Sequence, residues 1–119
     1  TVYDNNKKNL IKDLIIPQDL FIYKNALKKA QSYCENLHMS KQGIYEQLTS
    51  EYGEDFEKDA ARYAIDNLEC DYKANALAKA KSYRDNMSMS KNAIYDQLIS
   101  EYGEEFTKSE AKYAIDNLD

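Results

Sequence analysis

Residues 26–68 read ALKKAQSYCENLHMSKQGIYEQLTSEYGEDFEKDAARYAIDNL, and residues 76–118 read ALAKAKSYRDNMSMSKNAIYDQLISEYGEEFTKSEAKYAIDNL. The two stretches align without a gap, and roughly two thirds of their positions are identical. Because both apolar and polar positions return, the chain holds two copies of one small fold. Any surface that one copy builds is offered twice, which suits a binding protein better than an enzyme.

Each copy has the spacing of three short helices. Apolar and aromatic residues form three stripes in the first copy: Ala26, Leu27, Ala30, Tyr33 and Leu37; Ile44, Tyr45, Leu48 and Tyr52; Ala61, Ala64, Ile65 and Leu68. The second copy repeats the stripes: Ala76, Leu77, Ala80, Tyr83 and Met87; Ile94, Tyr95, Leu98 and Tyr102; Ala111, Ala114, Ile115 and Leu118. We therefore expect an all-α fold of two tandem three-helix, helix-turn-helix-like repeats joined by a short linker.

The expected boundaries are residues 1–22 for an N-terminal spacer or leader segment, 23–70 for the first repeat and 71–119 for the second. Leu10, Ile11, Leu14 and Ile15 have the spacing of one or two amphipathic turns, and Asp19 is a candidate cap for the first repeat helix. The leader is either a spacer from an anchor or a flap over the first copy, and we favour the spacer. Each copy is so small that the two either pack together or stay marginal separate units.

Local signals predict where the helices begin and end. Ser40 and Ser90 stand where an N-cap belongs, and Thr107 with Glu110 has the pattern of a capping box that the first copy lacks. Gly53 and Gly103 follow the second stripe of each copy, so we expect them to end the helix in the left-handed conformation.

The charge pattern favours a basic partner. The chain has 119 residues and a net charge of −5, and the acidic excess lies in the two repeats, whereas residues 1–22 are neutral. An acidic surface repels nucleic acid and anionic lipid and attracts basic proteins. A helix-turn-helix-like unit raises DNA binding as an alternative, but the third helix of each copy carries about as much acid as base, so we expect no nucleic-acid partner.

Catalytic and metal-binding patterns are missing from the sequence. There is no glycine-rich phosphate loop and no Ser/His/Asp catalytic set. The single histidine, His38, is replaced by Ser88 in the second copy. We expect no enzyme activity, no cofactor and no metal. Neither Cys34 nor Cys70 has a cysteine at the equivalent position of the other repeat, so we favour free thiols. A disulfide between the two stays open as the alternative.

Eight of the eleven tyrosines pair across the copies. Tyr33, Tyr45 and Tyr52 are expected to cap a small core together with their counterparts. Tyr63 and Tyr113 fall off the apolar stripes, and we interpret them as exposed aromatic anchors at a partner surface.

The repeated patterns SYxxN, MSKxxIYxQLxSEYGExF and YAIDNL resemble the Ltp-like repeat of host cell surface-exposed lipoproteins of temperate phages and Gram-positive bacteria. The resemblance covers about residues 25–119. It implies a lipoprotein held on the outer face of the cytoplasmic membrane by a lipidated cysteine. It also implies superinfection exclusion, in which the protein blocks entry of an incoming phage genome, with the phage tape measure protein as the target.

Neither Cys34 nor Cys70 lies in a lipobox, so the anchor is expected upstream of Thr1, and this anchor is the only membrane contact that we expect. We predict a monomer that binds a basic segment of the tape measure protein. The predicted partner-binding residues of the second copy are Glu101, Glu104, Glu105, Glu110, Tyr113 and Asp116, and those of the first copy are Glu51, Glu54, Asp55, Glu57 and Asp59. The second copy is preferred because it lies farther from the anchor.

The carboxylates next to Gly53 and Gly103 are expected to be exposed to solvent. Exposed ion pairs contribute only about 0.2–1 kcal/mol each, so several of them must act together with an apolar contact. Two other functions remain open from the sequence: a cell-wall-binding module, and a cytoplasmic acidic module for protein interaction, such as a DNA mimic.

Overall fold

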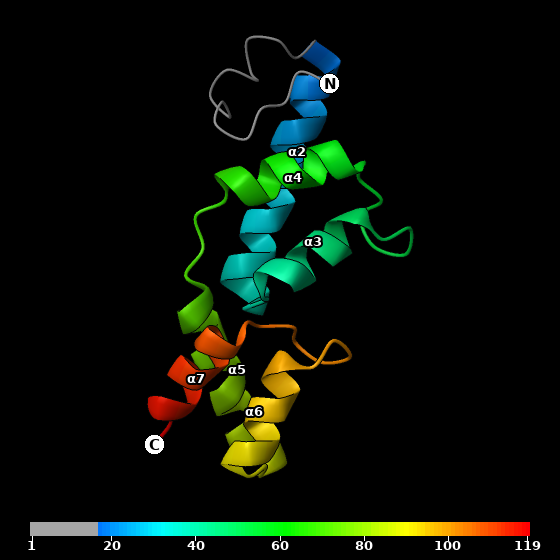
Figure 1. Cartoon of the computed structure of the whole chain (residues 1–119). Helices are drawn as coiled ribbons and strands as arrows, with labels where there is room; N and C mark the ends of the chain where they lie inside the picture. Colours follow the sequence, from blue (N-terminus) through cyan, green and yellow to red (C-terminus); the bar gives the residue numbers. More distant parts are fainter. Residues whose placement is uncertain (1–16) are drawn as a thin grey trace. The chain divides into compact units, whose positions relative to one another are not determined.

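The structure, a computed structural model, describes residues 17–119. This part of the chain forms six helices and no strand (Figure 1). The helices are α2 (Pro17–Leu37), α3 (Lys41–Thr49), α4 (Lys58–Asn67), α5 (Tyr72–Met87), α6 (Lys91–Ile99) and α7 (Lys108–Asp116). The predicted all-α fold of two three-helix repeats is thus confirmed. The amphipathic turns predicted around Leu10 and Ile15 lie outside the described residues.

The first helix begins earlier than the repeat does. α2 begins at Pro17, so residues 17–22, which the sequence assigned to a spacer, are helical. Proline is well tolerated in the first turn of a helix, where its missing N–H would have no partner within the helix. Asp19 lies inside this first turn, where its negative charge suits the positive end of the helix dipole. The prediction that Asp19 is the cap was therefore wrong.

The described residues divide into two compact units that do not coincide with the two repeats. One unit contains residues 17–31 and 45–69, and the other contains residues 32–44 and 70–119. The end of α2, the turn after it and the start of α3 therefore belong to the same unit as the second repeat. A sequence repeat and a packing unit are different divisions of this chain.

The core of the second unit lies between α5, α6 and α7, which pack around one another (Figure 1). Its buried side chains are Ala76 and Ala80 of α5, Ile94 and Leu98 of α6, Ala111 and Ala114 of α7, and Phe106 and Leu118. Alanines on α5 and α7 let these helices approach closely, and the larger side chains of α6 fill the remaining space. Burying each of the larger side chains contributes about 1.5–3 kcal/mol.

The helix starts predicted at Ser40, Ser90 and Thr107 are confirmed. The Ser40 hydroxyl accepts the amide hydrogen of Gly43 at 3.0 Å, and the Ser90 hydroxyl accepts that of Ala93 at 3.1 Å. Thr107 and Glu110 form the predicted capping box at the start of α7. In the first repeat, Glu57 occupies the cap position of α4 without a side-chain hydrogen bond, as the sequence predicted.

The first predicted core stripe of each copy extends one residue too far. Leu37 and Met87, the last residues of the first stripe in each copy, are 51% and 63% exposed. Both stand at the C-terminal end of their helix, next to His38 and Ser88, whose backbones are left-handed. Because each helix ends at this residue, its side chain lies at the exposed end of the helix and not in the core.

Candidate partner-binding loops

Two loops of nearly identical sequence connect the second and third helices of each repeat (Figure 1). We call residues 50–56, SEYGEDF, the first tip loop and residues 100–106, SEYGEEF, the second tip loop. These loops hold six of the predicted partner-binding residues: Glu51, Glu54, Asp55, Glu101, Glu104 and Glu105.

The backbone of each tip loop is held by hydrogen bonds to the preceding helix and serine. In the second tip loop, five consecutive amides donate hydrogen bonds: Tyr102 to Ser100 Oγ (3.1 Å), Gly103 and Glu105 to the Ser100 carbonyl (3.0 and 3.2 Å), Glu104 to the Gln97 carbonyl (3.1 Å) and Phe106 to the Leu98 carbonyl (2.8 Å). The first tip loop has all five at the equivalent positions. Because no amide in this run lacks a protein partner, both loops have one defined backbone conformation.

The glycines of the tip loops serve a different purpose from the one predicted. Neither Gly53 nor Gly103 has a positive φ, so the prediction of left-handed glycines was wrong. The left-handed residues are instead Asp55 and Glu105, with φ of 55° and 61°. Glycine is needed because a side chain at Gly103 would overlap the carbonyl oxygen and side chain of Gln97. The same close approach occurs at Gly53.

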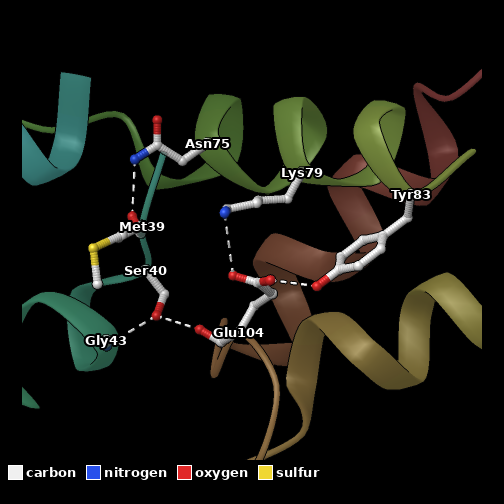
Figure 2. Close-up of polar contacts among 7 residues, drawn as sticks. All are labelled: Met39, Ser40, Gly43, Asn75, Lys79, Tyr83 and Glu104. Carbon is white, nitrogen blue, oxygen red and sulfur yellow. Dashed lines mark hydrogen bonds and ion pairs between the residues drawn. The ribbon is translucent and has the colours of Figure 1, made fainter. Parts of the chain in front are cut away.

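Glu104 is tied to α5 rather than presented to solvent. Its carboxylate accepts a hydrogen bond from the Tyr83 hydroxyl and lies 3.7 Å from Lys79 Nζ (Figure 2). Burial, the hydrogen bond to Glu104 and the negative charge of this carboxylate raise the pKa of Tyr83 to about 12. The hydroxyl therefore stays protonated at neutral pH and remains a donor to Glu104.

The first repeat has a similar ion pair. Lys29 Nζ lies 3.6 Å from Glu54 Oε1, and Lys29 and Glu54 are the counterparts of Lys79 and Glu104. Glu54, Glu104 and Glu105 are all half-buried, whereas the sequence led us to expect exposed carboxylates here. The expectation was wrong for these three residues and correct for Asp55, which is exposed. Glu54 and Glu104 are half-buried because each pairs with a lysine of the first helix of its repeat.

The second tip loop also contacts the turn before α3. The Ser40 hydroxyl, which caps α3, donates a hydrogen bond of 2.5 Å to the backbone carbonyl of Glu104 (Figure 2). Close by, Asn75 Nδ2 donates to the Met39 carbonyl at 2.9 Å. Ser40 and Asn75 are both buried, so these bonds satisfy polar groups that water does not reach. They fix residues 39–40 in the second unit.

Cys34 and Cys70 form a disulfide. The expectation of free thiols was therefore wrong. The bond joins α2 to the link before α5 and lies within the second unit, next to the Asn75 side chain. The positions fifty residues away hold Arg84 and Leu20, so this bond has no equivalent in the other repeat.

The remaining predicted carboxylates have different surroundings. Glu51, Asp55, Glu57, Asp59, Glu101 and Asp116 are exposed, and Glu110 is half-buried. Glu110 is engaged in the capping box with Thr107, and Asp116 pairs with Lys112 Nζ at 2.7 Å. The structure thus brings the predicted residues together around the tip loops only in part, because Asp59 lies on α4 and Glu110, Tyr113 and Asp116 lie on α7.

Both tyrosines predicted to be exposed anchors have intramolecular partners. Tyr63 is half-buried, and its ring centroid lies 5.1 Å from that of Tyr23. Tyr113 is 38% exposed, and Lys73 Nζ lies over its ring, 5.7 Å from the centroid. Tyr23 and Lys73 are counterparts in the two repeats, so the same position covers the tyrosine in two chemically different ways.

The most exposed aromatic side chains are residues that the sequence assigned to the core. Tyr52 is 93% exposed and Tyr102 is 92% exposed. Both continue the helical spacing of their stripe, but the helices end at Thr49 and Ile99, before the tyrosines. The Ser-Glu-Tyr-Gly sequence could have indicated their exposure. In each loop the serine hydroxyl accepts a hydrogen bond from the tyrosine amide two residues later, which forms a turn and ends the helix.

Two classes of site do not occur in the part of the chain that the structure describes. No helix between residues 17 and 119 has both the length and the apolar character needed to cross a membrane. In the same range, His, Cys, Asp and Glu side chains do not gather in groups of three or more that would hold a metal ion.

Comparison with known proteins agrees with the architecture of both repeats. The family model described as host cell surface-exposed lipoprotein matches residues 22–68 and again residues 71–118. Among solved structures, the chain is similar to Ltp, a superinfection exclusion protein from the Streptococcus thermophilus temperate phage TP-J34. The identity is 42%, the TM-score is 0.75, and the match covers 88% of this chain and 100% of that one. No curated protein matches. The chain therefore belongs to the family of host cell surface-exposed lipoproteins.

Proposed function

We propose that this chain is the outer domain of a lipoprotein that acts in superinfection exclusion. It is held by a lipid anchor on the outer face of the cytoplasmic membrane of a Gram-positive host. There it binds a basic segment of the tape measure protein of an incoming phage and blocks entry of the phage DNA. The observation that carries the proposal is the similarity to Ltp, a superinfection exclusion protein, over both repeats.

The disulfide supports the proposed location. Disulfides form and persist in oxidising environments outside the cytoplasm and are rare inside it. Cys34 and Cys70 are the two cysteines of the chain, and both are used in this bond. A location outside the cytoplasm explains this bond better than the alternative of a cytoplasmic interaction module.

The exposed carboxylates support a basic partner. The first tip loop and the residues after it present Glu51, Asp55, Glu57 and Asp59, and the second tip loop presents Glu101. Each exposed pair with a basic side chain contributes about 0.2–1 kcal/mol, so binding needs several pairs at once. We therefore assign to Glu104 and Glu54 the role of holding the loops, and to the exposed carboxylates that of meeting the partner.

The test uses the full chain displayed on cells behind a lipoprotein signal sequence. Charge reversal at exposed positions, Glu51→Lys and Glu101→Lys, is expected to restore plaque formation by a phage that the unmodified protein excludes. Asp85→Lys is a charge-reversal control, because Asp85 is exposed on α5, belongs to neither tip loop and pairs with Arg84 at 2.7 Å. Exclusion that persists in both loop variants, or is lost equally in the control, contradicts the assignment. A larger effect of Glu101→Lys than of Glu51→Lys is expected if the second copy carries more of the activity.

A further inference from the structure

Tyr52 and Tyr102 do not contribute appreciably to the stability of this fold. At 93% and 92% exposure their rings bury almost no surface, and hydrophobic stabilisation scales with the area removed from water. Single exposed aromatic residues are ordinary on protein surfaces. Here, however, the same residue is exposed to the same extent at the same position of two loops whose backbone hydrogen bonds agree in every partner.

The backbone of each loop beneath the ring is held by hydrogen bonds. Five consecutive amides of each loop are hydrogen-bonded, and Gly103 and Gly53 close each loop tightly against the glutamine of the preceding helix. The carboxylate of Glu104 adds a side-chain tie to Tyr83 and Lys79, and that of Glu54 adds one to Lys29. A ring on such a loop meets a partner without the entropic cost of ordering the backbone.

The chemistry around the rings selects for a cation. Glu54 and Glu104 are paired with Lys29 and Lys79. The carboxylates that stay exposed near the rings in sequence are Glu51, Asp55 and Glu57 in the first repeat and Glu101 in the second. An aromatic face next to carboxylates attracts an arginine or lysine side chain through both the ring and the charge. The same surroundings repel the phosphates of nucleic acids and anionic lipids.

We propose that Tyr52 and Tyr102 are aromatic contact residues of this protein, each of which packs against an arginine or lysine side chain of a basic protein segment. Lys73 over the ring of Tyr113 is an example, within the same chain, of a tyrosine that accepts a cation in this way. The proposal rests on the proposed function in one respect, namely that the partner is a basic protein segment. It adds which residues touch the basic side chains.

The binding experiment uses the full chain and an end-capped hexa-arginine peptide as the probe. Chemical shifts of backbone amides and tyrosine rings are followed by NMR during a titration at low salt. We expect shifts centred on residues 50–56 and 100–106. The double variant Tyr52→Ala/Tyr102→Ala should bind the probe about fourfold more weakly at each loop, because each loop loses one cation–π contact. The double variant Tyr52→Phe/Tyr102→Phe should stay within about twofold of the unmodified chain, because it keeps both rings.

Leu37→Ala/Met87→Ala is the matched control, because it also removes a pair of exposed side chains at equivalent repeat positions. We expect it to leave binding unchanged. The tyrosine variants should unfold at the same urea concentration as the unmodified chain, so a loss of binding by them does not reflect a loss of fold. Unchanged binding by the alanine variant overturns the proposal, as does an equal loss in the phenylalanine variant or peptide-induced shifts confined to other regions.

Phage plating separates the failure of this inference from the failure of the proposed function. If cells that display the unmodified chain exclude the phage and cells that display the double alanine variant exclude it equally well, the tyrosine contacts are wrong and the function stands. If the unmodified chain does not exclude any phage, the proposed function fails, and the peptide titration alone decides whether the tyrosines accept cations.

Discussion

The serine that begins the second helix of each repeat provides a sharp test of how the turn before α3 is held. Ser40 and Ser90 occupy equivalent positions, and each caps its helix by accepting one backbone amide hydrogen. Ser40 is 1% exposed and donates a second hydrogen bond to the Glu104 carbonyl at 2.5 Å, whereas Ser90 is exposed to solvent. Replacing each serine with alanine removes the same cap but leaves the part-buried Glu104 carbonyl without its donor only in the first case.

The expected magnitudes follow from these contacts. Loss of a serine N-cap costs about 1 kcal/mol, so Ser90→Ala should lower the free energy of unfolding by about that amount. Ser40→Ala loses the cap and also deprives the Glu104 carbonyl of its partner, which adds about 1–2 kcal/mol. We therefore expect Ser40→Ala to cost roughly 2–3 kcal/mol and to exceed Ser90→Ala by at least about 1 kcal/mol.

The measurement is equilibrium unfolding in urea at pH 7 and 25 °C, followed by circular dichroism at 222 nm. The slope of unfolding free energy against urea should be the same in both variants, which shows that the comparison concerns stability and not the unfolded state. A second pair, Ser40→Gly and Ser90→Gly, should show the same difference with smaller losses, because glycine is itself an acceptable N-cap. Equal losses at the two positions would refute the role assigned to the Ser40–Glu104 hydrogen bond.

Three further predictions concern the fold. The pKa of Tyr83 is raised to about 12 in the folded chain, so the protonated hydroxyl stabilises the folded state. The free energy of unfolding, measured in urea, should therefore fall by roughly 1–2 kcal/mol as the pH rises from 10 to 12. In Tyr83→Phe the free energy of unfolding should depend less on pH over this range. Reduction of the disulfide, or Cys34→Ser/Cys70→Ser, should cost about 4 kcal/mol because the closed loop is long, seen as a lower melting temperature. Thr107→Ala should cost about 1 kcal/mol in urea unfolding, whereas Glu57→Ala should cost little, because Glu57 makes no cap hydrogen bond.

Each of these predictions has a contradicting result. A slope between pH 10 and 12 that is unchanged in Tyr83→Phe would show that other groups cause it. A melting temperature that does not respond to reducing agent would contradict the stabilising role of the bond between Cys34 and Cys70. Equal losses for Thr107→Ala and Glu57→Ala would show that the capping box contributes nothing.

The sequence predicted those parts of the fold that depend on neighbouring residues. The N-cap at Ser90 and the capping box of Thr107 and Glu110 involve partners three residues apart, so their pattern is visible in the chain itself. The stripes of α6 and α7 were correct over their central residues, because a helix that faces a core repeats its apolar residues with the helical period.

The predictions failed where the outcome depends on a turn or on distant residues. Tyr52 keeps the helical spacing, but the serine turn ends α3 before it, so periodicity placed in the core a side chain that is exposed. The bond between Cys34 and Cys70 joins residues 36 positions apart, which no local pattern brings together. The half-burial of Glu104 likewise depends on Tyr83 and Lys79 of another helix.

The division into units affects how the activity should be mapped onto the chain. Residues 32–44 lie in the first repeat by sequence but in the second unit by packing, and the disulfide and the Ser40–Glu104 hydrogen bond lie within that unit. A truncation at the repeat boundary would remove Cys34 and Ser40 from the unit that they help to hold. Point variants in the full chain, such as Glu51→Lys and Glu101→Lys, therefore compare the two copies more cleanly than separate halves do.

The central claim is that the displayed protein stops phage DNA from entering a cell to which the phage has already attached. The most direct measurement counts attached phage particles and, on the same cells, the phage DNA that reaches the cytoplasm, with and without the displayed chain. We predict equal attachment and a large fall in internal phage DNA in cells that carry the chain. Equal amounts of internal phage DNA in both cell types, or a fall that only mirrors reduced attachment, would contradict the account.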